Sequence, residues 1–400
     1  MKRRFLVVTM VSFAAFVIFS AIGFSEVFAA APATIKIGGA VSTTGGFAGA
    51  GAQVKTGYEF AVSDINEAGG VFVKEYGKKI PLELIVLDDE SNPTKTVSRL
   101  ETLYSVNQVV AYLGGFSSVL NSASCAVGEK NKVPWIGVAF SAEAPHKQGF
   151  KYLFSPFQKS HDYRSLQVFK DMPKDKRPQR LAIWQIEDDW GREMGEVWKK
   201  DADEFGAKIV SYEKYALGAK DFSPLIMKAK AADAEMVLAV PTPPEGVAMM
   251  KQIKELDYRP KAVFFVRAPD GSTWGALPEG NYVLLAPGWH SSMKFPMVDK
   301  INAKYQAKFN RPADAMVGPA YACVQIIADS IERAGKLDRE AIRDAMAKTN
   351  MMTVMGPMSF YPNGMPIIKF FVICQWQNGK LESVSPKEHA SAPLVYPIPR

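Results

Sequence analysis

Serine hydroxyls follow two predicted strands in the first third of the chain, where they could hold an anion. Ser117 and Ser118 come after a strand predicted over residues 109–113 and open a helix predicted over 118–129. A serine at the start of a helix can cap it and, with the free amides of the first turn, bind a carboxylate. Helix capping without a ligand is the alternative for both residues. Ser141 places a further hydroxyl after the next predicted strand.

A charged pair follows a strand predicted over residues 262–266. Arg267 carries a guanidinium that could clamp a carboxylate through two hydrogen bonds, or could neutralise Asp270 in the same loop. A salt bridge at the surface between Arg267 and Asp270 would account for both residues without a ligand. These alternatives stay open from the sequence.

Two other loops hold weaker candidates. Phe47 lies in a glycine-rich loop over residues 42–51, whose backbone amides could cradle an anion, although a flexible turn explains the same composition. Thr242 follows a strand predicted over 236–240. Because Pro243 comes next and starts a helix, a structural turn is an equal explanation for Thr242.

Short apolar runs alternate along the chain with segments that have helical periodicity. This alternation predicts that strands and helices of an α/β fold with parallel sheets position the residues above. Strands are predicted over residues 34–41, 82–87, 109–113, 134–138, 180–186, 207–215, 236–240, 262–266 and 282–286. Helices are predicted over residues 94–106, 118–129, 162–170, 191–205, 224–231, 244–256, 296–309 and 317–334, with a further helix ending at Gly69-Gly70. A strand pair is predicted over 358–361 and 367–376, before an extended tail from 383 to 400. Ligands of such sheets bind at the carboxyl ends of the strands, where all the candidates above lie.

The first 30 residues have the pattern of a secretory signal peptide. A basic start at Lys2 to Arg4 precedes an apolar run from Phe5 to Phe24 and small residues that end at Ala31. An uncleaved membrane anchor is the alternative, because the apolar run approaches the length that spans a bilayer. Cleavage near Ala30 predicts a protein that works outside the cytoplasm, in the periplasm.

Composition and spacing argue against several classes of protein. The chain is 48% hydrophobic and 22% charged, and its net charge of +7 comes from scattered basic residues, so nucleic-acid binding is not expected. The four histidines lack the spacing of a metal site, and no cofactor is expected. No G-x-S-x-G elbow is present, which argues against a secreted hydrolase. The three cysteines lie in apolar surroundings and are predicted to be buried thiols, although one bridge is possible.

At this point the sequence resembles the type I periplasmic binding proteins, in particular the branched-chain amino-acid group that serves ABC transporters. The resemblance rests on GYEFAVSDINEAGGV at 57–71, LDD at 87–89 with NP at 92–93, DFSPL at 221–225, and MGP at 355–357 with Phe360 and NG at 363–364. It implies two Rossmann-like lobes joined by three hinge crossings. The implied division is an N-terminal lobe of residues 31–155 and 287–355 and a C-terminal lobe of 156–286 and 356–400, after a signal peptide of 1–30.

The resemblance also implies roles for the candidate residues. Ser117 or Ser118 would grip the α-carboxylate of a ligand, Ala139 and Ser141 would contact the same group, and Asp270 would face its ammonium. The residues implied to complete the pocket are Phe47, Phe140, Trp190, Thr242 and Arg267. Core packing is the alternative for Trp190. Because Phe47, Phe140 and Trp190 are aromatic, an aromatic amino acid or aromatic carboxylate is as good a candidate ligand as a branched-chain amino acid.

The expected protein is a monomeric solute-binding component of an ABC importer. It would close its lobes on a small carboxylate by hinge motion and deliver the ligand to a membrane permease, with no catalysis. An extracytoplasmic sensor that docks on a membrane receptor is the alternative.

Overall fold

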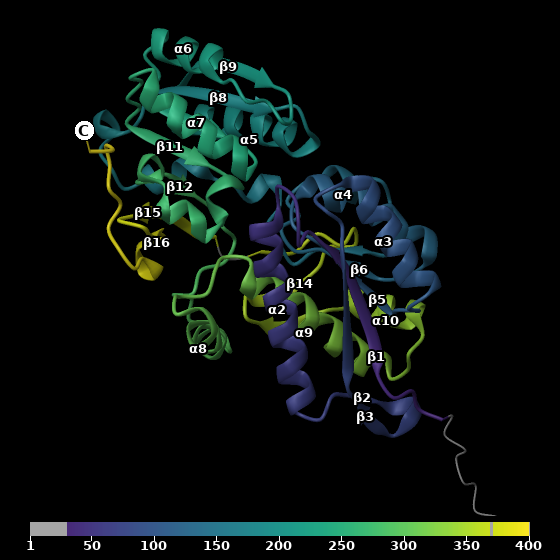
Figure 1. The fold of residues 1–400 in the computed structure, drawn as a ribbon. Helices are drawn as coiled ribbons and strands as arrows, with labels where there is room; N and C mark the ends of the chain where they lie inside the picture. The colour runs from purple at the N-terminus through teal and green to yellow at the C-terminus, as the bar shows by residue number, and fades with distance from the viewer. Residues whose placement is uncertain (1–29, 369–370, 400) are drawn as a thin grey trace, which may run out of the picture.

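Two lobes, each built around its own sheet, make up the computed structural model, which describes residues 30–368 and 371–399 (Figure 1). The predicted signal peptide lies outside the described residues except for Ala30. Both lobes have the α/β architecture that was predicted.

The sheet of the N-terminal lobe is parallel and has the order β4-β1-β5-β6-β7. Its strands are β1 (Ile35–Val41), β4 (Leu82–Asp88), β5 (Ala111–Leu113), β6 (Trp135–Ile136) and β7 (Leu153–Phe154). The helices of this lobe are α2 (Ala48–Glu67), α3 (Pro93–Ser105), α4 (Ser118–Asn131), α8 (Val298–Phe309), α9 (Val317–Ala334) and α10 (Arg339–Ala347), and a small hairpin joins β2 (Val71–Val73) to β3 (Lys78–Ile80). Central strand β1 is buried at nearly every residue, as expected for a parallel strand covered on both faces.

The sheet of the C-terminal lobe has the order β16-β15-β12-β11-β10-β8-β9. Its parallel strands are β8 (Arg180–Ile186), β9 (Lys208–Tyr215), β10 (Met236–Ala239), β11 (Ala262–Phe265) and β12 (Leu284–Leu285), and β15 (Ile373–Gln377) and β16 (Lys380–Ser385) join antiparallel. The helices are α5 (Asp189–Phe205), α6 (Ser223–Ala231) and α7 (Pro243–Glu255). The parallel part repeats the strand order of the first sheet. In such a sheet the order reverses beside the first strand, and ligands bind in the crevice outside the strand ends at that point.

The chain passes between the lobes three times, after β7, after β12 and after β14 (Gly356–Ser359). The predicted lobe boundaries at 155/156 and 286/287 fall in the first two passages, and the division of the chain there stays a proposal. The third boundary, at 355/356, would cut the hairpin of β13 (Asn350–Thr353) with β14. Gly356, at φ +93°, makes that tight turn, so the passage itself comes later, before β15.

Two sequence predictions about local structure were wrong. Residues 162–170 form short 3₁₀ turns, η3 (Ser160–Asp162) and η4 (Ser165–Phe169), instead of one helix, because the Leu166 N–H donates to Asp201 of α5 at 2.8 Å. Among the described residues, the predicted pairing of 358–361 with 367–376 consists of a bridge between Phe360 and Pro366 and a hydrogen bond from the Ile367 N–H to the Ser359 carbonyl. The longer hairpin is β15–β16, whose turn uses Asn378 and Gly379, both at positive φ, the usual residues of a two-residue turn.

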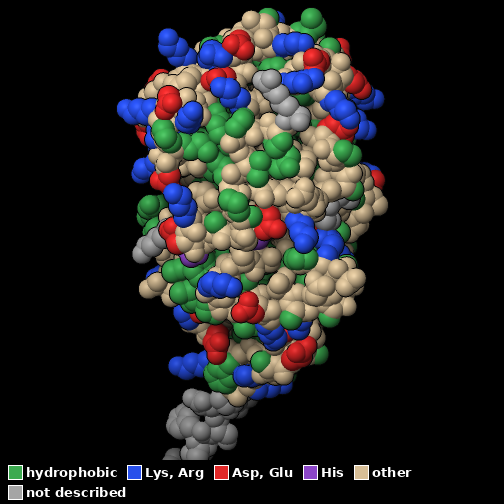
Figure 2. Space-filling view, turned by 90° about the vertical axis from the view of Figure 1, so that its left-hand side faces the viewer, with side chains coloured by type: hydrophobic (Ala, Val, Ile, Leu, Met, Phe, Trp, Pro, Cys, Tyr) green, Lys and Arg blue, Asp and Glu red, His purple; other side chains and the backbone are tan. Residues whose placement is uncertain are grey.

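The surface mixes both signs of charge. On the face shown in Figure 2, Lys and Arg side chains alternate with Asp and Glu. Within residues 30–368 and 371–399, no helix is long and apolar enough to cross a membrane, and no cluster of His, Cys, Asp and Glu side chains could hold a metal ion. The cysteines, Cys125, Cys323 and Cys374, are all buried and unpaired.

Gly51 lets α2 start close to the end of β1, and this close approach gives a prediction. A Cβ at Gly51 would lie 1.8 Å from the Ser42 carbonyl oxygen, whereas a Cβ at Gly49, two residues earlier on the exposed side of the helix, would meet nothing within 4 Å. Gly51→Ala is expected to lower the free energy of unfolding by about 2 kcal/mol. The matched change Gly49→Ala should raise it by about 0.5 kcal/mol through the unfolded chain. Urea denaturation of both variants measures this, and equal effects would contradict the packing explanation.

Candidate ligand-binding site between the lobes

The two predicted serine segments of the N-terminal lobe are in direct contact. The Ser118 hydroxyl oxygen accepts hydrogen bonds from the N–H groups of Ser141 and Ala142, each at 3.2 Å. Ser117 is the N-cap of α4, and its hydroxyl accepts from the Val119 N–H at 3.4 Å. Ser117, Ser118, Ser141 and Ala142 are all buried. Capping, the alternative for this pair, therefore does occur at Ser117, while Ser118 ties the ends of β5 and β6 together.

Backbone strain gathers at the predicted site. Ser117 (φ +87°), Ala139 (φ +50°) and Arg267 (φ +83°) all lie in the left-handed half of backbone space that favours glycine. Each such conformation costs on the order of 1–3 kcal/mol and is typical of ligand-binding and switch regions. These strained residues follow β5, β6 and β11, so both lobes turn sharply where their strands end.

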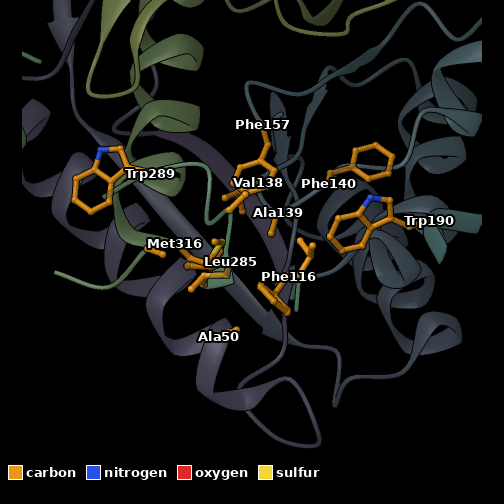
Figure 3. Close-up of a cluster of buried hydrophobic side chains, with 14 of the residues drawn as sticks. Ala50, Phe116, Val138, Ala139, Phe140, Phe157, Trp190, Leu285, Trp289 and Met316 are labelled. Carbon is orange, nitrogen blue, oxygen red and sulfur yellow. The ribbon is translucent and has the colours of Figure 1, made fainter. Parts of the chain in front are cut away.

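Tyr163 connects the two lobes at the centre of the site. Its hydroxyl hydrogen-bonds the Ser141 hydroxyl at 2.9 Å, and its ring meets the Trp190 ring edge-on at a centroid distance of 5.7 Å. Trp190, which follows β8, is 5% exposed. Figure 3 shows Trp190 in one buried cluster with Phe116 and Ala139 of the N-terminal lobe. Predicted site residues of both lobes are thus brought together.

Arg267 lies against the other side of this aromatic pair, and its partner was not predicted. The Arg267 guanidinium carbon is 4.9 Å from the centre of the Trp190 ring, and Nη2 donates to Asp188 at 3.1 Å. Arg267 is 1% exposed. The alternative of a surface salt bridge with Asp270 is therefore wrong, because Arg267 is buried and pairs with the residue that caps α5.

Asp270 borders a pocket of about 670 Å³ between the lobes, which is also lined by Arg311, Asp314 and Trp376. Its backbone carbonyl accepts from the Gln53 side chain of α2 at 3.3 Å. Desolvation raises the pKa of the Asp270 carboxyl to about 8, and the nearby Arg267 opposes this less strongly. At neutral pH the carboxyl is largely protonated.

Three predicted residues are engaged in packing or capping. The Phe140 ring is fully buried between Trp135, at 5.5 Å and edge-on, and His146, stacked at 5.5 Å, so its ring does not line an opening between the lobes. Phe47 is 8% exposed and packs on Phe116 at 5.8 Å. Thr242 caps α7 through a reciprocal bond with Glu245, which is the structural turn weighed above.

Glu193 of α5 forms a second connection between the lobes. Its carboxylate accepts from the N–H groups of Glu143 (2.8 Å) and Ala144 (2.7 Å), which follow β6, and from the Ser160 hydroxyl. Such charge-assisted bonds stabilise by about 1.5–3 kcal/mol each. They join the two lobes in the arrangement seen here.

A larger pocket, of about 880 Å³, lies away from this site. Its walls include Tyr258 and Lys261, together with Ile398 of the C-terminal tail. None of the predicted site residues borders it. The tail follows this surface, with the Ile398 N–H bonded to the Lys261 carbonyl at 2.9 Å, as the extended tail was predicted to do.

Comparison with known proteins agrees with this geometry. Residues 34–380 match a family model described as periplasmic binding protein. The chain belongs to the periplasmic binding protein family. This match and the relatives described next together confirm the predicted resemblance to its type I, branched-chain amino-acid group, and the fold of two lobes is confirmed as well.

Several relatives of this periplasmic binding protein have been characterised or named. Leu/Ile/Val-binding protein homolog 1 of Brucella abortus (strain 2308) is 27% identical over 371 residues, which cover 90% of this chain and 96% of that one. A leucine-binding protein from Thermotoga maritima superposes with a TM-score of 0.78 at 21% identity, covering 88% of this chain and 98% of that one. A solute-binding protein from R. palustris in complex with benzoate gives 0.75 at 17% identity, covering 90% and 97%.

Sequence reasoning missed four residues of this binding protein's interlobe site. Asp188 and Tyr215 stand at the ends of β8 and β9, so the rule that selected Arg267 could have found them. Tyr163 and Glu193 carry no such signal. Tyr163 lies in the segment wrongly predicted as a helix, and Glu193 looks like any acidic residue on a helix surface.

Proposed function

We propose that this periplasmic binding protein is the solute-binding component of an ABC importer, which closes its lobes on a small carboxylate and delivers it to a membrane permease. One observation carries the proposal. Residues predicted as ligand contacts in both lobes, Ser118 and Ser141 in one and Trp190 and Arg267 in the other, form a connected series through Tyr163, which was not predicted.

The geometry suggests how binding would drive closure. A ligand shifts the lobes toward the closed form only by its differential affinity, so it must touch both of them. The serine hydroxyls and strained amides after β5 and β6 would hold its carboxylate, and Trp190 would cover it from the other lobe. The contacts of Glu193 and Gln53 across the lobes then form together with the bound state.

The ligand class that fits is a branched-chain amino acid, an aromatic amino acid or an aromatic carboxylate. The names of the structural neighbours support an aliphatic amino acid as well as an aromatic carboxylate, since one neighbour binds leucine and another holds benzoate. We further propose that the leader is removed near residue 30 and that the mature protein works in the periplasm as a monomer.

A ligand panel tests the proposal. The mature protein, from residue 31, is unfolded and refolded to remove carried-over ligand and then heated with leucine, phenylalanine, benzoate and related acids. A ligand at 100 times its Kd adds about 2.7 kcal/mol to the stability of the folded state, so a rise of several degrees in Tm is expected with at least one small carboxylate. A panel without any rise would refute the proposed function. Small-angle scattering then checks that the active ligand compacts the protein.

A further inference from the structure

Arg267 is a buried cation with unused hydrogen-bond donors. Its Nη2 bonds to Asp188, but Nε and Nη1 have no partner among the residues that the structure describes. These two atoms carry three of the five guanidinium N–H groups. Leaving charged donors buried and unpaired is costly, and such groups are ordinarily satisfied by a carboxylate or another acceptor.

Two other buried side chains at this end of the C-terminal sheet also have a donor without a partner. The indole Nε1 of Trp190 and the hydroxyl of Tyr215 are buried, and in the described chain neither has a hydrogen-bond partner. Tyr215 ends β9, Trp190 follows the adjacent β8, and Arg267 follows β11, which β10 separates from β8, so these groups come from the same end of the C-terminal sheet. The three side chains together are called the donor cluster below.

The acceptors nearest this cluster are already occupied. Asp188 accepts from the Gly191 N–H at 2.6 Å as well as from Arg267. Glu245 accepts from the N–H groups of Thr242 at 2.8 Å and Gly218 at 2.7 Å. Asp270 borders the 670 Å³ pocket and is near enough to Arg267 for the two side chains to interact electrostatically. The free N–H groups of Arg267 and Trp190 can only donate, so a carboxylate would satisfy them and an ammonium group would not.

We propose that the ligand carries a second carboxylate, at the end opposite the one held by the N-terminal lobe, and that Arg267 binds it through Nε and Nη1. This inference rests on the proposed function and narrows its ligand class to dicarboxylates. The flat apolar rings of Trp190 and Tyr163 lie between the two ends and favour an apolar, planar middle. Arg267 suits this role because its fork binds a carboxylate with two parallel bonds, which lysine cannot do.

Calorimetric titration of the refolded mature protein with matched acids tests the inference. Terephthalate and benzoate differ only by the second carboxylate, and 4-aminobenzoate replaces it by an amine. Terephthalate is expected to bind at least 100-fold more tightly than either of the others. In Arg267→Lys this preference should fall to less than tenfold. Arg259→Lys, an exposed arginine paired with Asp257, is the matched control and should keep the preference.

The outcomes separate the two proposals. If leucine or benzoate binds as tightly as the dicarboxylates, the second carboxylate is wrong and the proposed function stands. If no acid on either panel binds, the proposed function fails. A preference for terephthalate that survives in Arg267→Lys would also overturn the role of Arg267. Should that variant not fold, Tyr215→Phe removes one donor at nearly constant volume and should reduce the preference several-fold, while an unchanged preference would count against the donor cluster.

Discussion

Lys159→Met is expected to raise the free energy of unfolding by about 3 kcal/mol at pH 6 and to have little effect at pH 10.5. Lys159 lies in the first passage between the lobes and is fully buried. Its ammonium donates to the Phe140 carbonyl at 2.5 Å and lies 4.4 Å from the centre of the Phe140 ring. These contacts replace only part of the hydration that a charged amine loses on burial.

The nearby carboxylates are bonded elsewhere. Glu193 accepts from the amides of Glu143 and Ala144, and Asp162 accepts from the backbone N–H of Lys159 at 2.8 Å. Burial accordingly lowers the pKa of Lys159 to about 7, although Asp162 and Glu193 raise it somewhat. Burying the charged Lys159 side chain therefore lowers the free energy of unfolding.

The direction of the pH effect follows from this pKa. Below pH 7 the amine is charged in both the folded and the unfolded chain, so the full cost of burying it is present. Between pH 7 and about 10.5 the unfolded chain binds more protons than the folded one, and stability rises with pH. The advantage of Lys159→Met should therefore shrink over this window.

Urea denaturation of the wild type and Lys159→Met at pH 6, 7.5, 9 and 10.5 measures the effect. Lys200→Met, at an exposed helix position, is the control and should show no comparable trend. A difference between Lys159→Met and the wild type that stays constant across this range would show that the amine is not a buried charge.

The sequence predicted elements well where one face or both faces of an element had to be apolar. The predicted strand at 180–186 is β8 itself, because its run of apolar residues has to be buried in a parallel sheet. The segment at 162–170 has a helical pattern too, but Asp201 and Trp198 of α5 bind its backbone and side chains from outside and hold it in 3₁₀ turns. Such contacts from distant residues leave no local signal.

The site residues divide in the same way, into those that a local sequence rule selects and those whose contacts come from distant residues. The rule that ligands bind at strand ends selected Ser118 and Arg267 without knowledge of their neighbours, and the resemblance to the family added Trp190. It could not pair Arg267 with Asp188, because these residues are 79 positions apart and Asp270, close by in sequence, was the obvious partner. Nor could it show that Phe140 is enclosed by His146 and Trp135, since an aromatic residue near a strand end suits a pocket and a core equally.

Affinity for a dicarboxylate is expected to fall as the pH rises above about 8, by up to tenfold per unit, and Asp270→Asn is expected to abolish this fall. Burial raises the pKa of Asp270 to about 8, and Arg267 acts on it electrostatically. Below that pH the carboxyl is neutral and does not repel an anion. Above it, Asp270 carries a charge close to the proposed second carboxylate, and binding requires that it take up a proton.

The sign of this dependence distinguishes the two kinds of ligand. An α-amino acid would need Asp270 ionised against its ammonium, so its affinity should increase as the pH rises toward 8. A dicarboxylate held by Arg267 should show the opposite slope, because the bound anion raises the pKa of Asp270 further.

Titration calorimetry at pH 6.5, 7.5, 8.5 and 9.5 measures both cases. Asp257→Asn is the control, since Asp257 is exposed and Arg259 lowers its pKa, so it is ionised throughout this range. An affinity for terephthalate that rises with pH in the wild type would reverse the assignment and return Asp270 to the role of ammonium partner.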